Sequence, residues 1–271
     1  MRHLTTPEYQ TIVDRLTPRC QEILKQYPCS PGVVDSVVLT CKREAELRRL
    51  IESGPAELWW RTTLLDNGSW YDINFAGYLS RTFGLVIWEP TNLGIGRALN
   101  NFIATRWRTN PEFILLIEDD LVMEPGYADL SWIGQCVEIF NENPHVGIIK
   151  LKNKAQWDEK PWRVIGPMQR TKSGVLWHPW LPSNPWHIWH GNRPWYAGIH
   201  NVWSLGPVMF RWAAWAENGM LPTAQGRGQA VAAEDWYART FNAKWIAARP
   251  VTVHPFSQPE TQQSPGYDDA I

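Results

Sequence analysis

Short apolar runs alternate with helical patterns between residues 33 and 151. We predict strands where β-branched or aliphatic residues run together, and helices where apolar residues recur every three or four positions. The predicted strands are Val33–Thr40, Leu58–Leu65, Leu85–Trp88, Phe113–Ile117 and Val146–Leu151, and the predicted helices are Glu44–Ser53, Arg97–Arg108 and Tyr127–Asn143. This alternation predicts an α/β fold with a mostly parallel sheet covered by helices on both faces.

The flanking regions do not follow this alternation. Residues 1–32 are predicted to form a helical N-terminal extension that packs on the core. Residues 152 to about 200 are rich in Trp, Pro, Lys and His without periodicity, and we interpret them as an insertion. Residues 257–271 are predicted to be a mobile tail. Between insertion and tail we expect an apolar stretch over Val202–Trp215, a helix over Ala232–Asn242 and a late strand over Trp245–Val253.

Composition places the chain among ordinary soluble globular proteins. It has 271 residues, 44% of them hydrophobic and 20% charged, with a net charge of −1, so global charge does not indicate a nucleic-acid binder. The four cysteines have no metal-ligand spacing and are expected to be reduced thiols. No signal peptide or membrane span is apparent, which predicts a cytoplasmic location. The 18 tryptophans exceed what we expect packing alone to use, so some are predicted to face a ligand.

Three carboxylates follow the predicted strand Phe113–Ile117. Glu118, Asp119 and Asp120 would repel one another at a strand end unless a cation lies there. A hard divalent ion such as Mg²⁺ or Mn²⁺ takes oxygen ligands, and it uses one or two carboxylates while leaving other positions to substrate phosphates. The alternative is an acidic loop that caps the following helix.

Polar groups suited to a nucleotide follow the other predicted strands. They lie in the segments Thr40–Arg43, Asp66–Ser69 and Asn92–Arg97. In a parallel sheet these segments would share one edge with the carboxylates, and this is the edge where ligands bind. A dinucleotide fingerprint is not supported, because Leu99 occupies the place of its third glycine.

The order of these motifs resembles inverting glycosyltransferases of the GT-A fold, family 2. VVLTCKR is similar to their first strand and nucleotide-binding turn, LLDNGS to the Asp-x-x-Ser element, and NLGIGRALN to the Asn-x-Gly...Asn segment. IEDDLVMEPG is similar to the metal-binding Asp-x-Asp region, and also to that of N-acetylglucosaminyltransferase I. The resemblance covers residues 33–151 and resumes at Ala233–Trp236, similar to the catalytic acidic pair. It implies a GT-A, Rossmann-like domain with a nucleotide-sugar-binding half over residues 33–151 and an acceptor-binding and catalytic half over residues 152–256.

The resemblance also implies roles for individual residues. Asp66 would contact the nucleobase and Glu118 the ribose side, while Asp120 would bind Mn²⁺ or Mg²⁺ at the diphosphate of a nucleoside-diphosphate sugar. His254 is a second candidate metal ligand, with an ordinary strand-end histidine as the alternative. Asp235 would be the general base, with Glu234 beside it; alternatively, both are common first-turn helix residues. The remaining candidate donor-binding residues are Thr40, Lys42, Arg43, Asn67, Asn92, Gly94, Arg97 and Asp119.

Residues 150–200 carry eight of the basic residues and only two acidic ones, together with seven tryptophans. Cations interleaved with aromatic rings suit an anionic polymer, with DNA that bears a hydroxylated base as the leading case. A glycan or lipid-linked acceptor stays open, as do two other classes: a nucleotidyltransferase and a binding protein for carbohydrate or nucleic acid. A solvated loop around a small tryptophan core is the alternative without function. The candidate acceptor-binding residues are Lys152, Lys154, Trp157, Trp162, Arg163 and Trp195.

Overall fold

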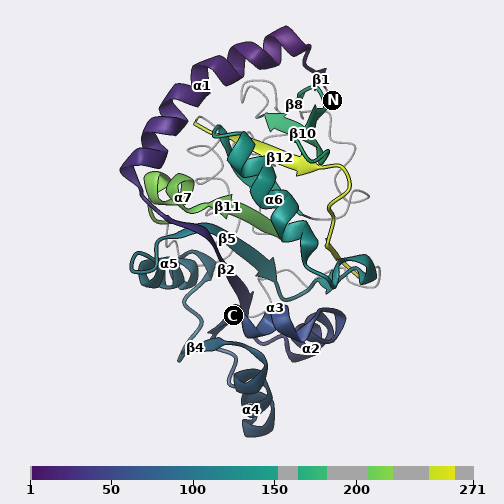
Figure 1. Cartoon of the computed structure of the whole chain (residues 1–271). Helices are drawn as coiled ribbons and strands as arrows, with labels where there is room; N and C mark the ends of the chain where they lie inside the picture. Colours follow the sequence, from purple (N-terminus) through teal and green to yellow (C-terminus); the bar gives the residue numbers. More distant parts are fainter. Residues whose placement is uncertain (1, 152–163, 182–206, 222–243, 260–271) are drawn as a thin grey trace, which may run out of the picture.

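The computed structural model describes residues 2–151, 164–181, 207–221 and 244–259, and a mixed, mostly parallel sheet organises them (Figure 1). Its strand order is β1-β8-β10-β12-β7-β11-β5-β2-β3-β4, with β9 paired to β10. The strands are β1 (Arg2–His3), β2 (Ser30–Thr40), β3 (Thr62–Asn67), β4 (Leu85–Glu89), β5 (Pro111–Glu118), β7 (Val146–Lys150), β8 (Val164–Ile165), β9 (Gln169–Arg170), β10 (Leu176–Leu181), β11 (Val208–Arg211) and β12 (Ile246–Pro250). The predicted fold class is confirmed.

Helices cover both faces of this sheet and create two cores. Successive residues of β2 point to opposite faces, so Val37 and Leu39 join one core and Val38 joins the other. The first core packs α1 (Thr6–Gln26), α5 (Ile95–Arg106) and α7 (Trp212–Asn218). The second core packs α2 (Glu44–Ser53), α3 (Ala56–Trp60), α4 (Ile73–Thr82) and α6 (Ser131–Glu142). Among the described residues, no helix is long and apolar enough to cross a membrane.

Two predicted elements are wrong in part. The strand expected at Leu58 begins at Thr62, because Leu58 and Trp59 lie in α3 and are both buried against the second core. The indole N–H of Trp59 donates to the Ile51 carbonyl oxygen at 2.9 Å. The helix expected from Tyr127 begins at Ser131, because a 3₁₀ turn, η1 (Pro125–Tyr127), precedes it and Leu130 has a left-handed φ of 59°.

The helix α4 was not predicted from the sequence. Asp72 caps it by accepting hydrogen bonds from the backbone N–H groups of Asn74 and Phe75. Only Phe75 and Leu79 on this helix are buried, so its apolar stripe is too narrow for periodicity to reveal.

Part of the predicted insertion belongs to the central sheet. The strand β10 pairs antiparallel with β12, and its Trp177 and Trp180 are buried on the two faces. Packing accounts for seven of the 18 tryptophans, which are buried: Trp59, Trp132, Trp177, Trp180, Trp212, Trp215 and Trp245. Ser257, the first residue of the predicted tail, lies in a strand. Ser257 pairs with Val122, because β13 (Phe256–Ser257) and β6 (Val122–Met123) form a second, two-stranded sheet.

The N-terminal helix α1 packs on the core as predicted. Thr5 and Glu8 form a capping box at its start, and Tyr9, Leu16 and other apolar residues of one face are buried in the first core. His145 lies beneath α1, with its ring nitrogens 3.3 Å from the Tyr9 hydroxyl and 3.3 Å from the Thr17 hydroxyl. Burial, and secondarily the charge of Arg211, lowers the pKa of His145 to about 4.

We expect stability to fall as the pH is lowered from 7.5 to 5. The unfolded chain takes up a proton on His145 near pH 6.5, whereas the folded chain resists protonation down to about pH 4. Over this window the linkage removes about 2 kcal/mol of the free energy of unfolding. Urea unfolding at both pH values, with His145→Gln as the comparison, measures this. If the free energy of unfolding fell by the same amount between pH 7.5 and 5 in the parent and in His145→Gln, His145 would be excluded as the cause.

Candidate active site

The polar strand ends meet at one edge of the sheet. Strands β2, β3 and β5 are parallel, and their register sets Thr40 beside Asp66 and Leu39 beside Glu118. The segments that follow these three strands therefore lie next to one another, at the edge where α/β proteins bind ligands. The sequence predicted this juxtaposition.

Asp119 lies beneath the surface of this edge. Its side chain is 1% exposed, and it accepts a hydrogen bond from the Thr40 hydroxyl at 2.8 Å and one from the Arg43 guanidinium at 3.3 Å. Burial raises the pKa of Asp119 to about 7, against the opposing effect of Arg43. Asp119 therefore positions Thr40 and Arg43, rather than offering its own oxygens to solvent.

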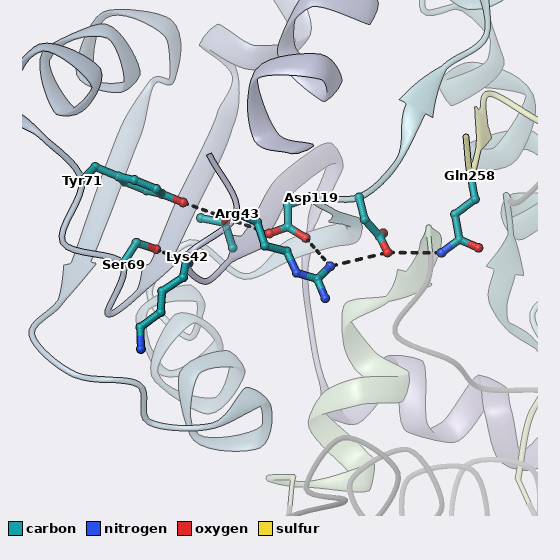
Figure 2. A network of polar contacts seen from close by, with 8 residues as sticks. Lys42, Arg43, Ser69, Tyr71, Asp119 and Gln258 are labelled. Atoms are coloured by element: carbon teal, nitrogen blue, oxygen red, sulfur yellow. Dashed lines mark hydrogen bonds and ion pairs between the residues drawn. The ribbon is translucent and has the colours of Figure 1, made fainter. Parts of the chain in front are cut away.

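Arg43 spans the two aspartates (Figure 2). Its guanidinium nitrogen Nη1 lies 3.3 Å from Asp119 Oδ1 and 3.5 Å from Asp120 Oδ2. The sequence predicted a divalent ion here, to offset repulsion between adjacent carboxylates, and the structure places the guanidinium of Arg43 between them. The side chain of Arg43 is only 16% exposed, so its charge is held at the site rather than in bulk solvent.

A short segment near the C-terminal end of the described chain, residues 255–258, reaches Asp120. Pairing of β13 with β6 and a hydrogen bond from Glu124 N to Pro255 O (2.9 Å) hold this segment against the residues that follow Asp120. As a result, Gln258 Nε2 donates to Asp120 Oδ2 at 3.2 Å (Figure 2). Gln258 was not among the predicted site residues, because a single glutamine 138 positions away carries no local signal.

The loop after β3 is tied to the loop after β2. Both Asp66 oxygens accept from Ser69, one from its backbone N–H at 3.2 Å and one from its hydroxyl. The Ser69 hydroxyl oxygen also accepts from the backbone N–H of Lys42 at 2.7 Å. Tyr71 reaches across to Thr40, with 3.2 Å between their hydroxyl oxygens. Asp66 is 2% exposed and burial raises its pKa, so in this structure its carboxylate anchors the loop.

The loop that follows β4 contacts the end of β3. The Asn67 side chain donates to Asn92 Oδ1 at 3.0 Å and accepts from the backbone of Leu93 at 2.9 Å. Only glycine fits at position 68, since its φ is +84° and an added Cβ would lie 2.5 Å from the backbone of Thr91 and Asn92. Beyond this contact, Gly94 precedes α5 with a φ of 76°, and Arg97 is exposed in the first turn of that helix.

The fold is shared with solved glycosyltransferases, although no family model and no curated protein matches the chain. The S. aureus TarS fragment 1–349 in complex with UDP-GlcNAc superposes with a TM-score of 0.52 at 13% identity, covering 86% of this chain and 60% of that one. A mannosyltransferase from Pyrobaculum calidifontis, PcManGT, in complex with GDP-Man and Mn²⁺, gives a TM-score of 0.51 at 14% identity and covers 94% of this chain and 67% of that one. The chain has the GT-A glycosyltransferase fold. It spans about 60% of the length of the TarS fragment.

In this GT-A fold, the Asp120 carboxylate at the sheet edge fits a divalent metal ion whose remaining ligands come from the substrate and water. Among the residues that the structure describes, no group of three His, Cys, Asp or Glu side chains gathers as a protein cage. Asp120 supplies a carboxylate at the strand end, and Mg²⁺ or Mn²⁺ bound through one carboxylate takes its other ligands from phosphate and water. His254 Nε2 lies 3.0 Å from the Val251 carbonyl oxygen. The role of His254 as a metal ligand stays a prediction.

Several predicted site residues lie outside the described parts of the GT-A fold. These are the catalytic pair Glu234 and Asp235 and the acceptor candidates Lys152, Lys154, Trp157, Trp162, Arg163 and Trp195. Of the basic residues that the structure describes in this region, Lys150 is 6% exposed and adds little to a positive surface, whereas Arg170 and Lys172 are exposed. A cavity of about 530 Å³ lies elsewhere, between α2, α3 and α4, and contains none of the predicted site residues.

Proposed function

We propose that this protein is a metal-dependent glycosyltransferase that uses a nucleoside-diphosphate sugar. The observation that carries the proposal is the group of Arg43, Asp119 and Asp120 at the carboxyl ends of parallel strands in a GT-A fold. A buried carboxylate that positions a guanidinium beside a second carboxylate provides both charges that a metal-diphosphate complex requires. The similar structures in complex with UDP-GlcNAc, and with GDP-Man and Mn²⁺, add support.

In this proposal, different residues of the sheet edge bind or position different parts of the donor. Asp120 would hold Mn²⁺ or Mg²⁺, with Arg43 supplying a further positive charge to the diphosphate. Asp66, Asn67 and Asn92 would fix the loops that receive the nucleoside, as their hydrogen bonds to one another and to Ser69 support. Thr40 and Asp119 would position Arg43 and the loop after β2 through their hydrogen bonds, and Glu118 would contact the ribose side of the donor. The metal, when bound, stabilises the negative charge of the departing nucleoside diphosphate.

The reaction follows from these roles together with the general base that the sequence resemblance assigns. An acceptor hydroxyl oxygen would attack the anomeric carbon while the bond from that carbon to the phosphate oxygen breaks. The hydroxyl proton would pass to the Asp235 carboxylate, and the nucleoside diphosphate would leave. Attack on the face opposite the leaving group would invert the anomeric centre.

A screen of nucleotide sugars with Mn²⁺ tests the function directly. UDP-, GDP-, ADP- and CDP-sugars would be incubated with the protein and candidate acceptors, and the released nucleotide would be identified. Release of a nucleoside diphosphate with sugar transfer supports the proposal. Release of pyrophosphate would indicate a nucleotidyltransferase, and metal-independent binding without turnover would indicate a binding protein.

The acceptor that we propose is an anionic polymer, with DNA bearing a hydroxylated base as the specific case. The basis is the excess of basic residues over residues 150–200 in a chain of net charge −1. Such segregation would create a positive surface, and the tryptophans of this region other than the buried Trp177 and Trp180 would hold a base that has left the stack. A glycan or lipid-linked acceptor has less need of these cations.

We expect acceptor binding to weaken steeply with salt. Changing Lys152, Lys154 or Arg163 to Ala removes one cation that would bind a phosphate. Each such change should flatten the slope of log affinity against log salt by about one unit. Fluorescence anisotropy with single- and double-stranded DNA over a salt series measures this, and Lys25→Ala on α1 is a control outside the region. Salt-insensitive binding, or transfer to a neutral oligosaccharide, would exclude the polymer and leave the glycosyltransferase proposal intact.

A further inference from the structure

Two residues at neighbouring strand ends have backbone conformations that side chains rarely adopt. Lys42, after β2, and Trp70, after β3, both have a φ of 57°. Only two other non-glycine residues in the described chain share this property: Asn110, directly before β5, and Leu130, directly before α6. A left-handed backbone is costly for a bulky side chain, and such residues persist where the surrounding structure imposes them.

The neighbours of Trp70 impose its conformation. Ser69 is held by Asp66 and by the backbone N–H of Lys42, and Tyr71 is held through its hydroxyl by Thr40. Both sides of Trp70 are therefore fixed to the frame of the site. Figure 2 shows Lys42 pointing away from Asp119, whereas Arg43 turns toward it. The two consecutive basic residues thus serve different parts of the edge.

The indole of Trp70 is displayed to solvent from this fixed position. It is 79% exposed, in contrast to the many tryptophans that the two cores bury. Because the indole is exposed, it contributes little hydrophobic stabilisation to the folded chain. Packing of the side chain therefore does not explain why its backbone is held in a strained conformation. Its loop is the one that Asp66 and Ser69 hold, and the hydrogen bond from Lys42 N to Ser69 ties it to the segment that carries Arg43, which is proposed to contact the diphosphate.

We propose that Trp70 is the stacking platform for the nucleobase of the donor. This inference rests on the proposed function, because it assigns the base end of the same nucleotide. Every nucleobase has a flat π-face, so any of them can stack on an indole ring. Trp70 would therefore set the affinity for the nucleoside, and hydrogen-bonding groups elsewhere would select which base is bound.

The test measures the contribution of the base to affinity separately from that of the diphosphate. Calorimetry with Mn²⁺ would measure UDP, GDP, ADP and CDP, and pyrophosphate alone, on the parent chain, Trp70→Ala and Trp70→Phe. For the nucleotide that the parent binds most tightly, Trp70→Ala should weaken affinity about tenfold or more, and Trp70→Phe should retain most of it. Pyrophosphate affinity should be the same in all three. Trp60→Ala is the matched control, since Trp60 is also exposed (64%) but precedes β3 rather than following it.

Each other outcome overturns the inference in a distinguishable way. Unchanged nucleotide affinity in Trp70→Ala, or equal losses in Trp70→Ala and Trp60→Ala, would remove the platform while leaving the glycosyltransferase proposal in place. Loss of pyrophosphate affinity in Trp70→Ala would show that the residue supports the loop instead of the base. A parent chain that binds none of the nucleotides would overturn both proposals.

Discussion

Asp120→Asn is expected to weaken metal-dependent donor binding and to reduce turnover by large factors. The amide keeps the shape of the carboxylate and can still meet Gln258, but it removes the negative charge that attracts a divalent cation. Without that cation the diphosphate would lose its main counter-charge, so we expect about a 100-fold loss of nucleoside-diphosphate affinity in Mn²⁺ and about a 10³-fold loss of turnover. Calorimetry and a diphosphate-release assay measure the two effects.

The control for this experiment is Asp14→Asn. Asp14 is an exposed aspartate on α1, where it accepts a hydrogen bond from Gln10, so its replacement changes net charge by the same amount far from the strand ends. Direct Mn²⁺ binding, followed by the relaxation of water protons, gives a readout that does not depend on activity. Asp120→Asn with parental Mn²⁺ dependence would show that the metal is held elsewhere or is not used.

Asp235→Asn is expected to separate binding from chemistry. An amide cannot accept the proton of the acceptor hydroxyl, so turnover should fall by about 10²-fold or more. Donor affinity should stay near the parental value, because the resemblance assigns Asp235 to the acceptor side. Single-turnover kinetics with a saturating nucleotide sugar, together with calorimetry of the nucleoside diphosphate, measure both quantities in the same preparation.

Glu234→Gln is the matched comparison for that variant. The two carboxylates are adjacent in the sequence, and the resemblance makes Asp235 the base and Glu234 its neighbour. Turnover that survives in Asp235→Asn and collapses in Glu234→Gln would exchange their roles. A large loss of donor affinity in Asp235→Asn would instead place this residue in the donor site.

Much of the fold could be predicted because its signals are local. β-branched and aliphatic runs identified β2, β4, β5 and β7, and helical spacing identified α1, α2 and α5. The errors at α3 and at the start of α6 have a common cause. A five-residue helix that buries Leu58 and Trp59, and a left-handed Leu130, are stabilised by packing rather than by intrinsic propensity.

The candidate site also has features that the sequence predicted and features that it did not. The sequence by itself determined which polar groups follow the strands, since Thr40–Arg43, Asp66–Ser69, Asn92–Arg97 and Glu118–Asp120 are contiguous segments. Parallel pairing then predicted that they meet. Only the family resemblance distinguished the two aspartates after β5, because the alternation of side chains along a strand does not continue into the loop that follows it.

Tertiary structure alone decided the remaining features. It buries Asp119, places the Arg43 guanidinium between two carboxylates, and brings Gln258 to Asp120 from 138 residues away. It also leaves Trp70 exposed on a strained backbone while other tryptophans fill the cores. These features depend on contacts between segments distant in sequence, and on the desolvation that such contacts produce. Composition and periodicity report which residues are available, whereas burial and long-range pairing fix what each one contacts.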